Sequence, residues 1–341
     1  TMSERNDNPE RPGADGAKEP LAGRSFVSLV IPQFLGAFND NAFKQLILLL
    51  AVGLSMEAGD SYHQSLAGGI FALPFVLFSG FAGSFADRYS KTFIFRFCKA
   101  WEVLVMLLGC FAFYMGNIPL LYFTLFMMGM QSAFFGPAKY GVIPELVHDT
   151  KISMANAAII MLTNLSAILA VVVGGALYES YRGTAAEGVP DGLLWLPGAA
   201  LLIFAILGLI SAKQMPPLKA SAPEMKVKWE FFAPYLRTLK KMLSGETPIF
   251  VVCLLKAAFC MLAYVALLIL ADYTIVLGLP EKKVSVYLFG TVGVSIAVGS
   301  AIAGIISRGG IQPRLILAGG IGFGVVFVET VLWDLFWHGF R

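Results

Sequence analysis

The sequence has few charged residues. Asp, Glu, Lys and Arg make up 14% of its 341 residues, and 57% are hydrophobic, whereas an average soluble domain is about 25% charged. The net charge is only +3, and no basic patch is interleaved with aromatic residues. We therefore expect no nucleic acid partner, and the composition argues against an ordinary soluble domain.

Histidine and cysteine are also scarce. None of the three histidines begins the H-x4-D signature of acyltransferases, and no P-loop is present. The four cysteines all lie in apolar stretches and form no CxxC pair. The sequence therefore predicts no enzyme activity, no metal site and no cofactor.

Long apolar runs account for most of the chain. They form nine blocks, each long enough to cross the bilayer core as a helix. The blocks fall at about residues 26–54, 65–86, 92–115, 119–143, 154–178, 192–212, 248–276, 284–307 and 315–337. The sequence therefore predicts an all-α membrane protein.

Polar segments divide these blocks into two groups. Residues 1–24 are rich in Pro, Gly and charge, which predicts a disordered cytoplasmic tail. Residues 213–247 contain an amphipathic, Lys-rich run, KWEFFAPYLRTLKKML, and are expected to form a cytoplasmic linker. The predicted domains are a six-helix bundle at 25–212 and the first three helices of a second bundle at 248–341.

Lys and Arg are distributed unevenly between the two sides. If the N-terminus is cytoplasmic, most of the 25 Lys and Arg residues fall in the tail, the linker and the other loops on that side. Cytoplasmic loops of membrane proteins carry such an excess. We therefore expect a multi-pass protein with its N-terminus in the cytoplasm.

The loop between the second and third blocks reads GSFADRYSK, from Gly83 to Lys91. It resembles the loop signature of the major facilitator superfamily, G-x-x-x-D-R-x-x-K/R. Gly83 would permit close helix approach, Asp87 and Arg88 could pair, and Lys91 adds charge, so we predict a gate here. A generic charged turn is the alternative.

A degenerate copy of this loop, GIISRGGIQPR, lies between the eighth and ninth blocks, with Arg308 in the place of Asp87. Two copies fit two parallel six-helix repeats joined by a long linker. On this interpretation the chain has the major facilitator superfamily fold. It would hold nine of an expected twelve transmembrane helices, with a truncated second half.

Charged residues inside the predicted helices need an explanation, because each costs about 2.5–3.5 kcal/mol at the bilayer centre. They are Asp40, Lys44, Lys99, Glu102, Lys139, Lys256, Asp272 and Glu329. The balance of acids and bases indicates pairing or a polar cavity. Lys99 and Glu102, three residues apart, are expected to form a structural pair.

Asp40 is the strongest candidate for contact with a substrate. It lies about 21 Å along its helix from Phe26, deep in the membrane, between Asn39 and Asn41. Lys44 shares its helix face, so a local salt bridge is an alternative explanation of the two charges. That salt bridge leaves the amides unexplained, and we predict that these four polar side chains line a substrate path.

The end of the fourth block, FFGPAKYGVIPELV, holds a second candidate group. Gly136 and Pro137 are expected to break the helix, because proline lacks a backbone donor and clashes with the preceding turn. Lys139 and Tyr140 follow the break, and the lysine there would bind an anionic phosphate. Snorkelling of Lys139 to the cytoplasmic surface is the alternative.

The seventh block carries two further charges. Lys256, in the inner half, is expected to serve the second half of the cavity. Asp272, near the outer mouth, is predicted to be a gate, or else an interfacial charge. About 24 Å of helix separates them, so they cannot pair.

Three motifs, FLGAFNDNAFK, FFGPAKYGVIPELV and GSFADRYSK, together resemble the lysophospholipid transporter family of the major facilitator superfamily, over roughly residues 25–340. The resemblance implies flipping of lysophospholipids, such as lysophosphatidylethanolamine, across the bacterial inner membrane by alternating access. It implies head-group recognition by Asp40 and Lys139. It also implies a fused or separate acyltransferase/acyl-carrier-protein synthetase as a partner that re-acylates the lipid.

The chemistry of a zwitterionic head group agrees with this assignment. Lys139 offers a charge for the phosphate and Asp40 a charge for the ammonium, while the acyl chain could remain in membrane lipid. The alternative function is a proton-coupled exporter of small solutes or drugs, in which Asp40 would cycle protons. A non-transporting scaffold is disfavoured by the embedded charges.

Overall fold

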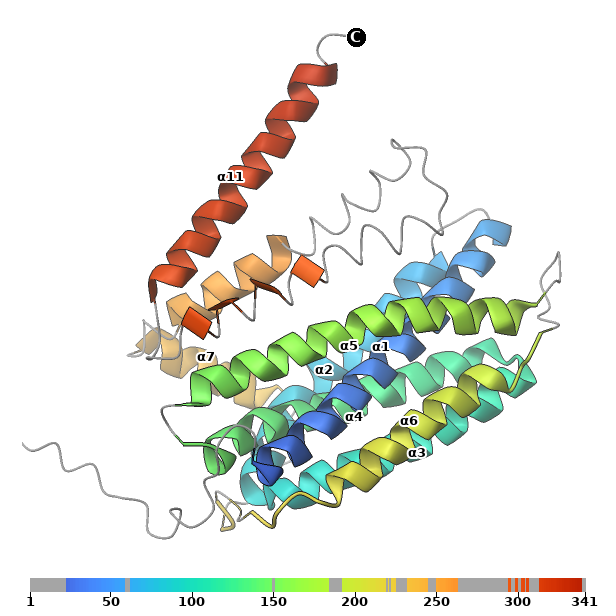
Figure 1. The fold of residues 1–341 in the computed structure, drawn as a ribbon, viewed down its shortest axis with the longest axis horizontal. Coiled ribbons are helices and arrows are strands. Elements are labelled where there is room, and N and C mark those ends of the chain that lie inside the picture. Colours follow the sequence, from blue (N-terminus) through green and yellow to red (C-terminus); the bar gives the residue numbers. More distant parts are fainter. Residues whose placement is uncertain are drawn as a thin grey trace, which may run out of the picture.

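The structure, a computed structural model, consists mainly of long helices (Figure 1). It describes residues 23–58, 62–148, 151–183, 192–218, 220, 222–224, 232–244, 250–262 and 313–338, with short pieces between 294 and 306. The predicted tail up to residue 22, the candidate gate Asp272 and most of the second loop copy lie outside these residues.

The first six apolar blocks each correspond to one helix. These helices are α1 (Arg24–Ala58), α2 (Tyr62–Arg88), α3 (Lys91–Met115), α4 (Ile118–Leu146), α5 (Ile152–Arg182) and α6 (Leu196–Ala212). Within the described residues, α3, α4, α5 and the greater part of α2 are long and apolar enough to cross a membrane. The prediction of an all-α membrane protein is therefore confirmed.

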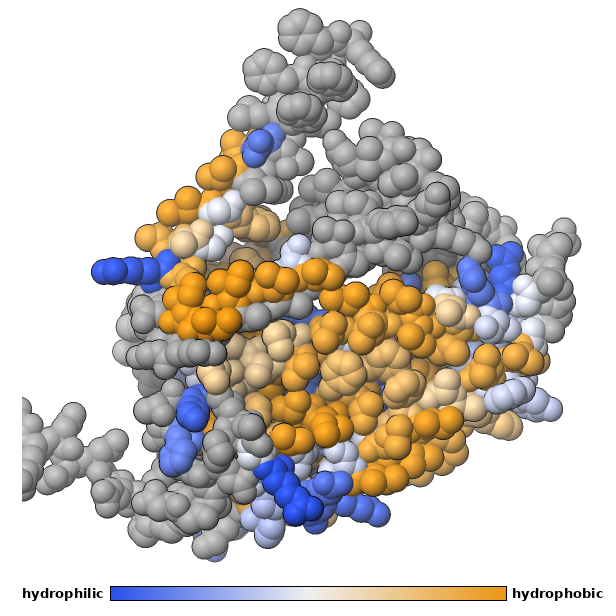
Figure 2. Space-filling view, in the orientation of Figure 1, coloured by the Kyte–Doolittle hydropathy of each residue, from blue (hydrophilic) through white to orange (hydrophobic). Residues whose placement is uncertain are grey.

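α1 contacts most of the other helices of the bundle. It packs against α5 and α6 and also contacts α2 and α4, while α3 packs against α4 and α6. Many outward-facing side chains are apolar, including Leu104, Val172 and Ile203. Figure 2 shows this apolar surface along the visible face, with hydrophilic residues gathered toward the ends. Such a surface suits lipid as the surrounding solvent.

Two apolar clusters fill the interior of the bundle. One includes Phe43 of α1 and Leu125 of α4. The other includes Phe95 of α3 and Phe135 of α4. The two clusters follow one another along α3 and α4, where Lys99 and Glu102 of α3 and Gln131 and Ser132 of α4 lie between them among apolar residues. On α1, Asn39 and Asp40 lie between Phe38 and Ala42 of the first cluster.

α4 is continuous through Gly136 and Pro137, so the predicted break in this helix is wrong. Proline removes one backbone donor and disturbs one turn. Neighbouring helices can hold such a turn in place within a membrane bundle. α1 and α2 likewise continue through Pro32 and Pro74.

The segment after α6 lies along the turn between α2 and α3. Ser90 Oγ in that turn donates a hydrogen bond to the carbonyl of Leu218 at 2.6 Å. Further on, the segment predicted to be amphipathic forms α7 (Ala233–Ser244). The last apolar block forms α11 (Pro313–His338), which extends away from the bundle in Figure 1.

Candidate functional site

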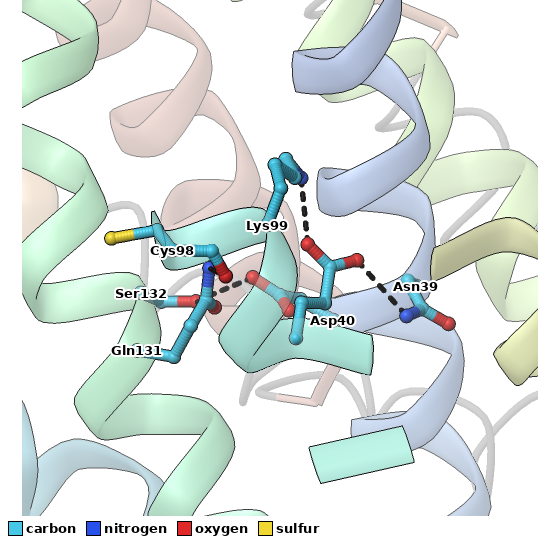
Figure 3. Close-up of polar contacts among 7 residues, drawn as sticks. Asn39, Asp40, Cys98, Lys99, Gln131 and Ser132 are labelled. Atoms are coloured by element: carbon cyan, nitrogen blue, oxygen red, sulfur yellow. Dashed lines mark hydrogen bonds and ion pairs between the residues drawn. The ribbon is translucent and has the colours of Figure 1, made fainter. Parts of the chain in front are cut away.

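A buried ion pair lies between the two apolar clusters. Lys99 Nζ is 2.7 Å from Glu102 Oε2, and both side chains are 1% exposed. Asn39 of α1 donates its amide to the other carboxylate oxygen, Glu102 Oε1, at 3.0 Å. The predicted Lys99–Glu102 pair is confirmed, and it joins α3 to α1 (Figure 3).

The absence of a side chain at Gly36 makes room for this ion pair. A Cβ atom at Gly36 would lie 2.0 Å from Lys99 Nζ and 3.4 Å from Glu102 Oε2. The ammonium group therefore packs against the backbone of α1. It also lies 5.0 Å from the centroid of the Phe135 ring on α4, so this lysine of α3 contacts both α1 and α4.

Asp40, the residue after Asn39, contacts α4 instead. Ser132 Oγ donates to Asp40 Oδ2 at 2.6 Å. The neighbouring Gln131 donates its amide to the carbonyl of Cys98 on α3 at 3.3 Å. Within the described part of the chain, Asp40 Oδ1 is buried and has no hydrogen-bond partner. One carboxylate oxygen is thus held by the protein, while the other could accept a bond from a donor.

We call the six residues that form this arrangement the polar layer. They are Asn39 and Asp40 of α1, Lys99 and Glu102 of α3, and Gln131 and Ser132 of α4 (Figure 3). The layer contains two acids and one base, and the base is bonded to only one of the acids. Its own residues therefore leave Asp40 without a cationic partner.

Lys44 does not supply that partner in this conformation. Among the described residues, the ion pairs do not include one between Asp40 and Lys44. Lys44 Nζ instead donates to Asn41 Oδ1 at 3.3 Å and lies 5.4 Å from the centroid of the Phe71 ring on α2. Asn41 in turn donates to the carbonyl of Ala37. The alternative of a local salt bridge is thus not what the structure contains.

Lys139 lies on the same face of α4 as Ser132, because seven residues make about two helical turns. It is about 10 Å further along the helix than the serine that binds Asp40. Lys139 Nζ is 4.6 Å from the centroid of the Tyr140 ring. Lys139 is half-buried and Tyr140 is exposed. Asp40 and Lys139 therefore lie on neighbouring helices, and Lys139 is two turns further along α4 than the serine that contacts Asp40.

The predicted gate residues make contacts that the sequence does not reveal. Lys91 forms an ion pair with Glu145 near the end of α4. Asp87 is exposed, and in the described structure no ion pair joins it to Arg88, whose guanidinium lies 5.5 Å from the centroid of the Tyr89 ring. The expected pairing of Asp87 with Arg88 is wrong, because consecutive helical residues do not face one another.

Two other predicted residues, Gly83 and Lys256, are not part of the polar layer. A Cβ at Gly83 would meet no described atom within 4 Å, so the expected close helix approach at this glycine is absent. Lys256 is exposed on the helical segment Phe250–Leu262. Asp272 lies outside the described residues.

Sequence reasoning missed Ser132 and Gln131, although two consecutive polar residues inside an apolar helix are a visible signal. It also treated Glu102 as a partner of Lys99 alone, because nothing in the sequence indicates that Asn39 reaches it. Asn39 is fully buried, so in this conformation its side chain connects two helices.

Residues 22–336, which include the six-helix bundle and most of α11, match the family model described as Major Facilitator Superfamily. The chain belongs to the major facilitator superfamily. This membership, together with the apolar helices, makes it a multi-pass membrane protein of a transporter family.

Several relatives of this superfamily member carry a more specific name. The lysophospholipid transporter LplT of Photorhabdus laumondii is 30% identical over 166 residues, which are 49% of this chain and 39% of the relative. That of Escherichia coli SE11 is 31% identical over 159 residues, 47% of this chain and 38% of the relative. That of Yersinia enterocolitica is 28% identical over 169 residues, which are 50% of this chain and 40% of the relative. The matched part spans about two-fifths of these relatives.

Proposed function

We propose that this major facilitator superfamily protein is a secondary transporter that flips lysophospholipids, such as lysophosphatidylethanolamine, across the bacterial inner membrane by alternating access. The names of its relatives support this substrate class. The observation that carries the proposal is the buried, unpartnered Oδ1 of Asp40 within the described bundle.

The ammonium of the head group is the ligand that fits Asp40. A carboxylate in a membrane bundle is costly unless it meets a positive charge, and Lys99 is already bonded to Glu102 at 2.7 Å. Ser132 donates to Oδ2 and orients the carboxylate, so that a substrate ammonium can take Oδ1. No ion pair of the described residues includes Asp40, so the substrate ammonium would supply a direct cationic partner.

The phosphate of the head group is the ligand that we assign to Lys139. Its side chain starts two turns along the same face of α4 that contacts Asp40. A lysine side chain is long enough to reach back over part of that distance, and its ammonium is a suitable point charge for phosphate. The exposed Tyr140 stacks beside this ammonium, which restrains the lysine.

Charge removal at Asp40 tests the assignment. Asp40→Asn keeps the size of the side chain and an oxygen that can accept from Ser132. Uptake of labelled lysophosphatidylethanolamine by spheroplasts, normalised to the amount of protein in the membrane, should fall roughly tenfold to a hundredfold, the value of a charge-assisted hydrogen bond. Lysophosphatidylglycerol, which has the phosphate but no ammonium, should be less affected.

Two further variants serve as controls. Lys139→Met should reduce uptake of both lipids, because both contain the phosphate. Lys44→Met should not restore uptake when combined with Asp40→Asn, because Lys44 bonds to Asn41 and not to Asp40. Equal loss of both lipids with Asp40→Asn, or full recovery in the double variant, would show that Asp40 does not bind the ammonium.

A proton-coupled exporter of small solutes remains the second candidate function, because an unpartnered carboxylate oxygen could also carry a proton. In that case a protonophore would abolish transport in energised vesicles. Lysophospholipid flipping that continues in the presence of the protonophore would exclude this candidate.

We also propose that the N-terminus is cytoplasmic and that a partner acyltransferase re-acylates the transported lipid.

We further propose a gating role for the α2–α3 turn. Lys91 in this turn forms an ion pair with Glu145 on α4. The carbonyl of Asp87 accepts a hydrogen bond from the amide of Ala222, in the segment after α6, at 2.8 Å. A conformational change in this turn would therefore alter its contacts with α4 and with the segment that follows α6.

A further inference from the structure

α7 has two chemically distinct faces. At 100° per residue, Leu236, Leu239 and Leu243 fall on one side of the helix together with Tyr235. Arg237 and Lys241 fall on the other side, and Lys240 lies at the boundary between the two faces. The helix contains no acidic residue, so its polar face is uniformly positive.

In the part of the chain that the structure describes, the apolar face of α7 is largely exposed. Leu236 is 66% exposed, Leu239 45% and Leu243 62%. A shallow hollow of about 360 Å³ lies along this face, lined by these leucines, Lys240 and Ser244. Apolar walls with an ammonium at the edge match an amphiphile, with its hydrocarbon against the leucines and an anionic head group near the lysine.

One tyrosine fastens α7 to the membrane bundle. Tyr235 Oη lies 2.6 Å from Ser79 Oγ of α2 and accepts from the amide of Gly80 at 3.1 Å. It also donates toward the carbonyl of Val76 at 3.0 Å. α7 is therefore held at a fixed position along α2.

This position is near the end of α2 that leads into the charged α2–α3 turn. Ser79 precedes Arg88, the last residue of α2, by about 13 Å of helix. An amphipathic helix at a membrane surface buries its apolar face about 5–10 Å into the boundary between head groups and acyl chains. An anchor about 13 Å inside the end of a spanning helix brings α7 near that boundary.

We propose that α7 is an interfacial helix that binds anionic phospholipid of the surrounding membrane. Its leucines enter the acyl region, and its bases contact the phosphates, since basic residues near the surface attract anionic lipid. The role concerns the membrane around the transporter and is independent of which substrate the polar layer binds.

Photocrosslinking of the full chain in nanodiscs tests this role. The photoreactive residue p-benzoylphenylalanine replaces Leu239 on the apolar face or, as a control, Lys241 on the basic face. The nanodiscs contain phosphatidylcholine alone or with phosphatidylglycerol. We expect lipid adducts at position 239 and few at 241, with phosphatidylglycerol captured above its mole fraction.

A charge variant separates the anionic preference from simple insertion. Arg237→Gln with Lys240→Gln should lower the excess of phosphatidylglycerol at position 239 by roughly fivefold per base, whereas Arg237→Lys with Lys240→Arg keeps both charges and should leave it unchanged. Protein adducts in place of lipid adducts at 239 would show that another part of a protein covers this face. Lipid capture that ignores head-group charge would overturn the anionic preference.

Discussion

Adding one methyl group at Gly36 of α1 should destabilise the protein. In Gly36→Ala the new Cβ would overlap with Lys99 Nζ, which lies 2.0 Å from its position. The ammonium cannot move without disturbing its buried bond to Glu102. We expect a loss of about 1–3 kcal/mol of stability, as for overpacking in a core, seen as a lower Tm in detergent.

A matched glycine provides the control for this substitution. A Cβ at Gly175 of α5 would meet no described atom within 4 Å, so Gly175→Ala should leave the Tm unchanged or raise it slightly, because alanine favours helix. If the Gly36→Ala and Gly175→Ala variants had the same Tm, the close contact between Gly36 and Lys99 would be wrong.

The buried ion pair gives a second prediction at this scale. Glu102→Gln should strongly destabilise the protein, by about 3–5 kcal/mol, because Lys99 would remain buried without an anion. Adding Lys99→Met should recover much of the loss, since the amide at 102 still accepts from Asn39 and no unpaired charge remains. Chemical or thermal unfolding of the single and double variants measures the difference. No recovery in the double variant would mean that the cost does not come from the unpaired lysine.

At the scale of elements, the docking of α7 depends on one hydroxyl group. Tyr235→Phe keeps the ring and removes the bonds to Ser79 and to the amide of Gly80. We expect α7 to leave α2 more often, which should speed tryptic cleavage after its basic residues and hydrogen exchange of its amides. Tyr114→Phe, at an exposed position on α3, is the control. Unchanged cleavage and exchange in Tyr235→Phe would show that packing alone holds the helix.

At the scale of the whole molecule, the two ends of the bundle can be told apart. Leu193 lies at the end where α5 finishes, because its amide donates to the carbonyl of Ser180. Glu224 lies near Ala222, whose amide bonds to Asp87 at the α2–α3 turn, at the other end.

With the native cysteines replaced, Leu193→Cys should react with an impermeant thiol reagent applied to sealed cells, and Glu224→Cys should react only after permeabilisation. The reason is the excess of Lys and Arg predicted on the side of the linker. The reversed labelling pattern would invert the proposed orientation.

Residue order alone determined the number and position of the first six helices. Each apolar block is close to the helix that it predicts, as with 92–115 and α3 (Lys91–Met115). Backbone groups in hydrocarbon must be bonded within the same segment, so a long apolar run has few alternatives to a helix. The matching family model over residues 22–336 agrees with the resemblance found in the loop motif.

Only the tertiary structure decided which polar groups meet. Asp40 and Lys44 share a helix face in the sequence pattern, yet Asp40 bonds to Ser132 of α4 and Lys44 bonds to Asn41. Gly83 was expected to permit the close approach of two helices, but Gly36 is the glycine against which a charged group, the Lys99 ammonium, packs. Helical periodicity fixes the face on which a side chain lies, whereas the partner on that face depends on the rotation and depth of neighbouring helices, which no local pattern records.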